Sequence, residues 1–458
     1  MRGSLILSSN LRSHRSVAWL LLGLGVLLLN PVRAEASWKA GVASVKITPT
    51  EPIWLAGYGS RDRPTGKVLQ DIFTKALALQ DESGAISVVV STDLLGLHRA
   101  MSEEVFNKVR QRFGLTRDRL VINASHNHSG PVAGEVLRSA YSMSEENEAV
   151  VGRYTEDLLD KMVSVIARSI QNLETANLEF EQGLAGFAVN RRRARKGKRH
   201  LPGPVDHDVP VLAVRSSKGA LKAIVFGYAC HATVLSGYEV SGDWPGFAQE
   251  SLERTHPGAV ALFLTGCGAD ANPLPRRSVD LARMYGEILA IAVNQVLDKE
   301  MNPVLGPLKT AFQRVDIPFQ TPPSRSELEK RIADEEGSLR RHAEHLLAIL
   351  DREGRIQDFY PYPIQVWSFG KGLTFIHLAG EVVVDYALRF KAQYGWDDIW
   401  VTGYSNEVFA YVPSLRVLKE GGYEGGGAMI PYGKPGPFRA AVEEIIAEKV
   451  DELVRLTE

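Results

Sequence analysis

The sequence predicts a mixed α/β protein, because short runs of aliphatic and β-branched residues alternate along the chain with longer amphipathic stretches. Its 458 residues are 45% hydrophobic and 23% charged, which is sufficient for a large core in one or two domains. The formal net charge of −1 does not indicate a polyanionic partner, so we expect no nucleic acid to bind. A basic stretch at 191–200 contains no aromatic residues, which favours a solvated loop over a nucleic-acid patch.

The expected strands are short and mostly apolar, as strands buried in a sheet are. They are predicted at 42–47, 85–91, 120–123, 209–214, 221–228, 260–264, 364–369 and 373–378. The expected helices repeat apolar residues every three to four positions and are predicted at 102–113, 150–172, 244–255, 279–299, 382–394 and 439–456.

A charged helical stretch at about 322–354 stands apart from this alternation. Two prolines precede it and a glycine ends it, which predicts a surface insertion. Its two histidines, His342 and His345, do not have the spacing of the helical zinc motifs, so we expect them on a solvated helix face.

The first 36 residues have the pattern of a secretory signal peptide. Arginines precede an apolar stretch at 17–29 that is short for a membrane span, and small residues at 32–36 fit a cleavage site. An uncleaved anchor is the alternative. We therefore expect a secreted or periplasmic protein whose folded part is residues 37–458. Its two cysteines, Cys230 and Cys267, are equally consistent with one disulfide and with two buried thiols.

Histidines follow two of the expected strands. His126 and His128 lie in the run VINASHNHSGP, and His231 lies in YACHATVLSG after the strand at 221–228. Two imidazoles one residue apart point the same way if the backbone between them is extended. Histidines at strand ends can gather around one ion, so the sequence indicates a candidate metal site. Buried histidines with ordinary hydrogen bonds are the alternative.

Two more loops at expected strand ends carry polar groups. The run TGCGADANP at 265–273 follows one strand, and Glu381 follows another through Ala379-Gly380. Function concentrates in such loops. Taken alone, however, Glu381 is better explained as a charge that complements the N-terminus of a helix than as a ligand.

Several motifs occur in the order found in neutral/alkaline ceramidases. They are AGVASVKITP (40–49), LAGYGSR (55–61), SHNHSGP (125–131), VNRRR (189–193), CHATVLSGYEVSGDWPGFAQ (230–249), GADANP (268–273), LAGEV (378–382), YSNEVFAYVP (404–413) and GGYEGG (421–426). The chain from Trp38 onward therefore resembles the catalytic domain of that zinc amidohydrolase family. The resemblance implies an α/β (α+β) fold in which mixed β-sheets are flanked by helices.

The resemblance implies one zinc ion per chain, held by His126, His231, Glu381 and Tyr411. Zinc accepts nitrogen and oxygen donors, and a catalytic site keeps a position for water or substrate. Once all four positions match the family, the ligand role of Glu381 outweighs its role at a helix terminus.

The resemblance also implies roles for neighbouring residues. His128 would exchange a proton with water and with the leaving amine. Arg191 and Tyr423 would contact the scissile amide and stabilise its oxyanion, by about 3 kcal/mol for each good donor. Asp93 and Asp243 are candidates for orienting the site, with local capping or turn formation equally open.

The sequence departs from the family at two points. Asn272 takes the place of a serine that has been proposed as nucleophile, and an amide cannot play that part. We therefore expect water activated by zinc to attack, with Asn272 at most a hydrogen-bond donor. The family's immunoglobulin-like C-terminal domain is not expected, because the chain ends soon after the helix at 439–456.

We therefore expect a secreted zinc-dependent amidohydrolase that cleaves the N-acyl amide of ceramide or a related, small lipid-like N-acyl substrate. The alternatives are a zinc hydrolase of another small amide or ester, such as an N-acyl amine or an acylated sugar, and a non-catalytic module stabilised by zinc. His128 and Arg191 disfavour the last, since structural zinc requires neither. A thiol hydrolase based on Cys267 and a serine hydrolase both lack their local motifs. Peripheral contact with a membrane stays open, and the sequence does not indicate an oligomeric state.

Overall fold

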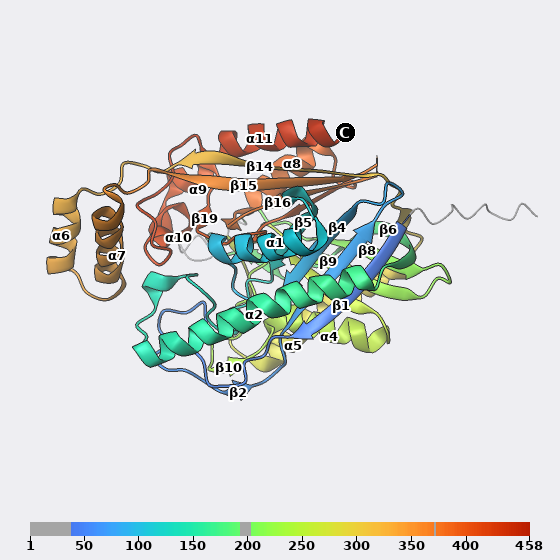
Figure 1. Cartoon of the computed structure of the whole chain (residues 1–458), viewed down its shortest axis with the longest axis horizontal. Coiled ribbons are helices and arrows are strands. Elements are labelled where there is room, and N and C mark those ends of the chain that lie inside the picture. Colours follow the sequence, from blue (N-terminus) through green and yellow to red (C-terminus); the bar gives the residue numbers. More distant parts are fainter. Residues whose placement is uncertain (1–37, 193–202, 371) are drawn as a thin grey trace, which may run out of the picture. The chain divides into compact units, whose positions relative to one another are not determined.

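The computed structural model describes residues 38–192, 203–370 and 372–458 (Figure 1). In these residues, nine strands form the larger of two main sheets. The strand order is β11-β9-β8-β6-β1-β3-β4-β5, with β13 paired to β6. Parallel pairs, β9 with β11 and β4 with β5, stand at its two ends. The strands are β1 (Trp38–Lys46), β3 (Phe73–Gln80), β4 (Ile86–Thr92), β5 (Leu120–Ala124), β6 (Glu174–Leu184), β8 (Asp208–Ser216), β9 (Leu221–Tyr228), β11 (Val260–Thr265) and β13 (Asn302–Pro303).

Side chains join the two ends of this sheet. The Ser91 hydroxyl donates to Phe263 O at 2.6 Å, and the Thr265 amide donates to Asn123 Oδ1 at 2.8 Å. The Thr265 hydroxyl also donates to Ala124 O at 2.8 Å. Strands β5 and β11 therefore lie side by side although they stand at opposite ends of the strand order. As a result, the loops that follow β5, β9 and β11 open at one place.

A second sheet packs against the first. Four strands of the described chain form it in the order β14-β15-β16-β18: β14 (Leu308–Pro318), β15 (Phe359–Phe369), β16 (Leu373–Leu378) and β18 (Ile399–Thr402). Large aromatic side chains of this sheet, such as Trp367 and Trp400, share a core with aliphatic residues of the larger sheet, such as Leu77 and Val121. The alternation of apolar residues along both sheets thus fills the space between them.

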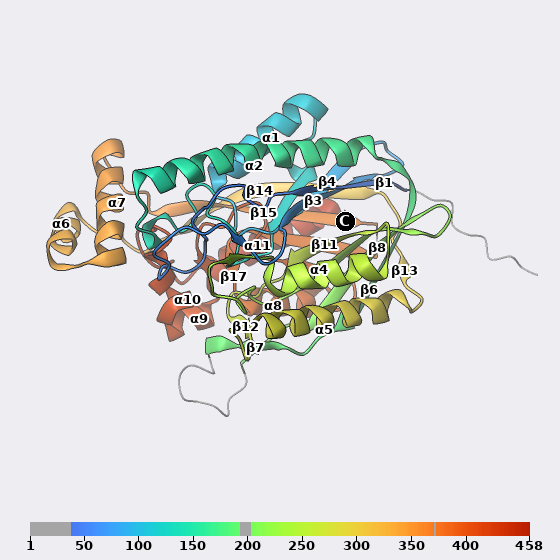
Figure 2. The same ribbon diagram turned by 90° about the horizontal axis from the view of Figure 1, so that it is seen from below.

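Helices cover the faces of the sheets that turn away from this shared core. On the larger sheet, α2 covers one part, and α4 with α5 covers another, as Figure 2 shows. On the smaller sheet lie α8 and α11. The arrangement confirms the predicted mixed α/β class. The helices are α1 (Arg99–Phe113), which packs on α2 (Glu145–Gln171), then α4 (Asp243–Thr255), α5 (Val279–Leu297), α8 (Val384–Tyr394) and α11 (Val442–Thr457).

Short elements complete the described chain. Two-stranded ladders pair β10 with β2, β12 with β7, and β17 with β19. The last two of these ladders position candidate site residues, as described below. The bounds are β2 (Lys67–Val68), β7 (Ala188–Asn190), β10 (Glu239–Val240), β12 (Ala271–Pro273), β17 (Glu381–Val382), β19 (Tyr411–Val412), α9 (Leu415–Glu420), α10 (Gly422–Gly425), and the 3₁₀ turns η1 (Arg117–Arg119), η2 (Arg138–Ala140) and η3 (Gly427–Met429).

The segment after β18 links the two sheets. Gly403 N donates to Thr265 O at 3.1 Å, and Tyr404 O accepts from Ala124 N at 3.2 Å. The segment therefore lies between the ends of β5 and β11, where the histidine loops open. Tyr404 and Asn406 have φ of 51° and 65°, a left-handed conformation that non-glycine residues seldom adopt.

Helices α6 (Arg325–Asp334) and α7 (Gly337–Glu353) occupy the stretch for which we expected a helical insertion. They share a small core of their own. His345 is exposed, as expected, but the solvated position expected for His342 is wrong. His342 is only 3% exposed, and its Nε2 donates to Lys434 O at 2.8 Å because this face of α7 packs on the loop after η3.

The expected signal peptide and most of the basic stretch at 191–200 lie outside the described residues. In the part of the chain that is described, no helix is both long and apolar enough to cross a bilayer. Cys230 and Cys267 both belong to the described residues, where they are buried free thiols and form no disulfide. Of the two alternatives for the cysteines, the structure therefore has the two buried thiols.

Candidate metal and catalytic site

His126, His128 and His231 converge where the loops after β5 and β9 meet. All three side chains are buried, and their candidate ligand atoms lie within 4.8 Å of one another. His126 Nε2 and His128 Nε2 are 3.2 Å apart. This group of imidazoles could hold a metal ion, as the sequence indicated.

The backbone at His126 differs from the extended form on which our argument for the paired imidazoles depended. Its φ is 53°, so the chain turns there, and the two rings meet because of that turn. Asn127 stabilises the turn: its amide nitrogen donates to Ser241 O at 2.6 Å, and its amide oxygen accepts from Ser129 N at 2.8 Å. A strained backbone at a site of this kind is a frequent mark of function.

Backbone carbonyls orient two of the rings. His126 Nδ1 donates to Leu95 O at 2.7 Å, and His231 Nδ1 donates to Gly268 O at 2.8 Å. Because a carbonyl can only accept, each Nδ1 carries the proton and each Nε2 turns a lone pair toward the cluster. The sequence did not single out these carbonyls, since any residue can supply one.

The structure gives Asp93 and Asp243 other partners. The Asp93 carboxylate accepts from Phe73 N at 2.9 Å, and the Asp243 carboxylate accepts from Leu235 N at 2.9 Å and Trp244 N at 2.6 Å. The bonds of Asp243 lie within its own loop and match the turn-forming alternative. Asp93 instead joins distant elements, because Phe73 belongs to β3 and Gln249 Nε2 of α4 also donates to its carboxylate at 3.1 Å. Burial raises the pKa of the Asp243 carboxyl to about 7.

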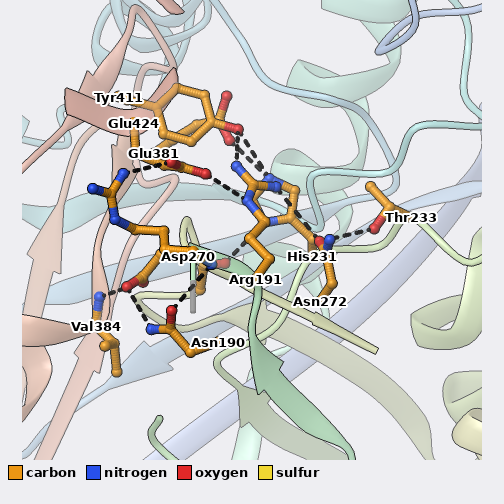
Figure 3. A network of polar contacts seen from close by, with 12 residues as sticks. Asn190, Arg191, His231, Thr233, Asp270, Asn272, Glu381, Val384, Tyr411 and Glu424 are labelled. Carbon is orange, nitrogen blue, oxygen red and sulfur yellow. Dashed lines mark hydrogen bonds and ion pairs between the residues drawn. The ribbon is translucent and has the colours of Figure 1, made fainter. Parts of the chain in front are cut away.

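A parallel ladder places Glu381 directly beside Tyr411, since β17 and β19 pair these residues. Glu381 Oε2 lies 2.9 Å from His126 Nε2 and 3.0 Å from His231 Nε2. The Tyr411 hydroxyl lies 3.2 Å from His231 Nε2, and Figure 3 shows the two side chains facing each other. Donors about 2.0 to 2.1 Å from a tetrahedral zinc ion are about 3.3 Å from each other. These three separations, and the chemistry of the four residues, therefore fit one such ion.

Burial and mutual contacts set the protonation of the cluster. Burial lowers the pKa of His231 to about 4, with the charge of Arg191 adding to the effect, and burial lowers the pKa of His128 well below its usual value. Burial alone would raise the pKa of Glu381, but His126 and His231 hold it well below its ordinary value. Neutral imidazoles beside an ionised carboxylate are the forms in which these groups bind metals.

Tyr432 holds the second oxygen of Glu381. Its hydroxyl donates to Glu381 Oε1 at 2.6 Å, and both side chains are buried. The carboxylate therefore turns only Oε2 toward the histidines. Tyr432 was not predicted, because an isolated tyrosine in a glycine- and proline-rich stretch carries no local signal of such a contact.

A second ladder places Arg191 next to Asn272. Strands β7 and β12 pair Asn272 with Val189, and Arg191 N donates to Asp270 O at 2.8 Å. Arg191 Nη2 then donates to the Tyr411 hydroxyl at 2.9 Å, and Nη1 reaches Asn272 Oδ1 at 3.5 Å. In this network (Figure 3) the Asn272 oxygen accepts, whereas we expected at most a donor from this residue.

Asp270 connects this ladder to the Glu381 segment. Its carboxylate accepts from Asn190 Nδ2 and from Val384 N, each at 2.9 Å (Figure 3). Asn190 precedes Arg191, and Val384 begins α8 just after β17. Asp270, a residue to which the sequence analysis gave no role, thus ties together the backbones that carry Arg191 and Glu381.

Tyr423 lies at the edge of the cluster. It is 41% exposed, and its ring meets that of Tyr411 edge-on with centroids 5.2 Å apart. The next residue, Glu424, is only 4% exposed and accepts hydrogen bonds from Arg191 Nε and Arg192 Nη1, both at 2.7 Å. Burial alone would raise the pKa of Glu424, but Arg191 holds it below its usual value. Our reading of the GGYEGG motif singled out the tyrosine and missed this glutamate.

The LAGYGSR segment packs around His128. A Cβ added at Gly57, whose φ is 94°, would lie 2.3 Å from His128 Nδ1, so only glycine fits there. The Tyr58 ring is centred 5.0 Å from the His128 ring, and Arg61 Nη1 donates to His128 O at 2.9 Å. These contacts hold the imidazole beside the other donors.

The buried cysteines do not supply a nucleophile. Burial raises the pKa of both the Cys230 and the Cys267 thiols well above the ordinary value. The thiolate is the reactive form of cysteine, so a thiol mechanism is disfavoured.

Comparison with known proteins identifies similar proteins of one family. A family model described as neutral/alkaline non-lysosomal ceramidase, N-terminal, matches residues 38–266. Neutral ceramidase A of Dictyostelium discoideum is 24% identical over 248 residues, covering 51% of this chain and 34% of that protein. Neutral ceramidase of Mycobacterium tuberculosis is 24% identical over 224 residues, covering 45% and 34%. These alignments span about a third of the length of each relative.

Solved structures extend the likeness of the fold over nearly the whole chain. Neutral ceramidase from Pseudomonas aeruginosa has a TM-score of 0.73 at 18% identity, covering 93% of this chain and 75% of that one. A ceramidase complexed with C2 has a TM-score of 0.72 at 18% identity, covering 92% and 75%. The family model itself spans half of the chain and includes His126, His128, Arg191 and His231. The chain therefore belongs to the neutral/alkaline non-lysosomal ceramidase family.

Proposed function

We propose that this protein is a zinc-dependent amidohydrolase that cleaves the N-acyl amide of ceramide or a related lipid-like substrate. The observation that carries the proposal is the convergence of two imidazoles, a carboxylate and a phenol on one point, with a guanidinium beside them. The names of the relatives and of the solved structures support an N-acyl lipid over other amides.

His126, His231, Glu381 and Tyr411 would hold the zinc ion. Two neutral imidazoles with oxygen donors are a common zinc ligand set, and a catalytic site keeps one further position for water or substrate. When bound, zinc polarises a carbonyl and lowers the pKa of water in that position to about 7.

His128 is the proton carrier of this mechanism. Its Nε2 lies 3.2 Å from His126 Nε2, and burial keeps the ring neutral, so that it is able to accept a proton. It takes a proton from the attacking water and returns one to the nitrogen of the leaving amine. The carbon–nitrogen bond then breaks, giving a carboxylic acid and a free amine.

Arg191 and Tyr423 act on the amide carbonyl. Arg191 reaches the Tyr411 hydroxyl, so its charge lies beside the ligand set, and Tyr423 lies at the open side of the same tyrosine. Donors aimed at the developing oxyanion lower the barrier by about 3 kcal/mol each.

Asn272 makes the reaction a single displacement by water. It occupies the position at which the family has a serine, and its carboxamide is not a nucleophile. Its oxygen instead accepts from the Thr233 hydroxyl at 3.3 Å and from Arg191 Nη1 at 3.5 Å. These two hydrogen bonds fix the orientation of the Asn272 side chain.

A substrate panel tests the proposal. Zinc-loaded protein is assayed against N-acyl sphingoids, N-acyl amino acids and simple esters under rapid quench, followed by peptide mass spectrometry. We expect hydrolysis of N-acyl sphingoids without a burst and without an acylated peptide. Cleavage confined to the other substrates would support the alternative of another small amide or ester. An acyl adduct on Cys267 or on any serine would overturn the single-step mechanism.

The segment at 1–36 supports a site of action outside the cytoplasm, as a secreted or periplasmic enzyme. N-terminal sequencing of protein recovered from the medium or periplasm should begin near residue 37. Protein that retains residues 1–36 and sediments with membranes would favour the anchor alternative.

A further inference from the structure

Glu424 stands between the guanidinium groups of two consecutive arginines. Its Oε1 accepts from Arg191 Nε and its Oε2 from Arg192 Nη1, each at 2.7 Å. Both carboxylate oxygens are therefore used, and the side chain is buried. Hydrogen bonds between charged groups at this distance are among the strongest in proteins.

The two arginines contact different parts of the protein. Arg191 continues into the site, where Nη2 donates to the Tyr411 hydroxyl and Nη1 approaches Asn272. Arg192 continues away from it, donating to Glu420 at 3.2 Å and to Gly421 O at 2.9 Å. A guanidinium is planar, so anchoring Nε of Arg191 also fixes the direction of its two amino groups. The anchor is therefore what aims Arg191 at Tyr411.

Glu424 also follows Tyr423 directly in the chain. The two residues are adjacent on the single turn of α10, and glycines flank that turn on both sides. The flanking glycines give the segment little stiffness of its own. The ion pairs of Glu424 with Arg191 and Arg192 attach the turn that carries Tyr423, whose ring meets that of Tyr411.

We propose that Glu424 is a positioning residue that aims Arg191 and, through its neighbour Tyr423, sets both groups that act on the substrate carbonyl. The assignment rests on the proposed amide hydrolysis for its kinetic consequence. Its structural part, the orientation of Arg191 by Glu424, stands on the contacts alone.

Glu424→Gln is the informative variant, because an amide keeps the shape but is able to accept from only one of the two arginines. Glu420→Gln is the matched control, because Glu420 is also a carboxylate that pairs with Arg192, and its other pair is with Arg416. Glu424→Asp retains the charge on a shorter side chain and tests for partial rescue.

The kinetic arm uses zinc-loaded enzyme and a short-chain N-acyl sphingosine in detergent micelles. We expect Glu424→Gln to lower kcat by about a hundred-fold, the loss typical of a misplaced catalytic group, while KM changes by less than about three-fold and zinc content stays at one per chain. Glu424→Asp should recover part of kcat, and Glu420→Gln should keep it. Equal losses in Glu424→Gln and Glu420→Gln would overturn the proposal.

The second arm needs no activity. In metal-free protein labelled with ¹⁵N-arginine, the Arg191 Nε–H signal, identified by its absence in Arg191→Lys, reports the bond to Glu424. It should shift in Glu424→Gln and stay in place in Glu420→Gln. An unchanged signal in a folded Glu424→Gln variant would overturn the proposal. If the wild type fails to hydrolyse N-acyl sphingoids, the proposed function fails, and this signal still decides the role of Glu424.

Discussion

Removing the Tyr432 hydroxyl should weaken zinc binding without removing any ligand. In the structure that hydroxyl donates to Glu381 Oε1 at 2.6 Å, while Oε2 faces His126 and His231. In Tyr432→Phe the buried Oε1 loses its donor, and the carboxylate is no longer held in the orientation that presents one oxygen to the cluster. The perturbation therefore acts on the geometry of Glu381 alone.

The expected magnitude follows from the type of contact. A hydrogen bond to a charged group contributes about 1.5 to 3 kcal/mol, and loss of a group that orients a metal ligand costs about 10- to 100-fold in affinity. Those factors correspond to about 1.4 to 2.7 kcal/mol of binding free energy. The side chains of Tyr432 and Glu381 are both buried. Leaving Glu381 Oε1 without its donor therefore costs free energy, because water does not readily take the donor's place.

Competition with a chromophoric chelator measures the zinc Kd of the metal-free protein directly. Tyr154→Phe is the control, because it also removes a buried hydroxyl, one that donates to Ile47 O at 2.8 Å away from the cluster. Its Kd should stay within about two-fold of wild type. A zinc Kd for Tyr432→Phe that equals the wild-type value, or is tighter, would refute the reasoning.

The remaining predictions concern the other histidines and one buried carboxyl. His126→Ala and His231→Ala should be purified without zinc by atomic absorption, whereas His128→Ala should keep about one ion per chain and lose about 10²- to 10⁴-fold in kcat. If His128→Ala lacks zinc and His126→Ala retains it, the two residues of the loop have exchanged roles. Asp243 has a folded-state pKa of about 7, raised by burial from 3.8, so its contribution to stability is fully present below about pH 4 and is lost as pH rises through 7. That contribution is on the order of 4 kcal/mol, and urea unfolding of Asp243→Asn across this range should show a flatter pH dependence than wild type. If the free energies of unfolding of Asp243→Asn and wild type depend on pH in the same way, this prediction is wrong.

Local patterns predicted many of the buried strands, but not all of them. Strand β9 (Leu221–Tyr228) has the predicted bounds, because a continuous apolar run marks a strand covered on both sides. The buried strands β3 and β18 were not predicted, and neither were the half-exposed strands β6 and β14. The sequences of β6 and β14 mix charged and apolar residues, and what holds β14 in place is distant in sequence: Gln313, for instance, bonds with Glu452 and Lys449 of α11.

The residues of the candidate site that lie in local motifs could be predicted from the sequence. Those whose contacts join residues distant in sequence could not. Histidines at strand ends indicated a metal site from local sequence alone, although the extended backbone assumed between His126 and His128 was wrong. Glu424 and Tyr432 gave no such indication, since Glu424 meets Arg191 across 233 positions of sequence. Contacts of that separation depend on the packed fold, and no local spacing rule describes them.

The four candidate ligands come in equal number from the two sheets. His126 and His231 follow β5 and β9 of the larger sheet, whereas Glu381 and Tyr411 follow β16 and β18 of the smaller. An ion shared by all four is thus a reversible cross-link that closes a loop of 150 positions between His231 and Glu381. Since only the folded chain assembles these donors, each tenfold rise in free zinc above Kd adds about 1.4 kcal/mol to the free energy of unfolding. Removal of zinc by a chelator would then weaken the contact between the two sheets and abolish hydrolysis at the same time.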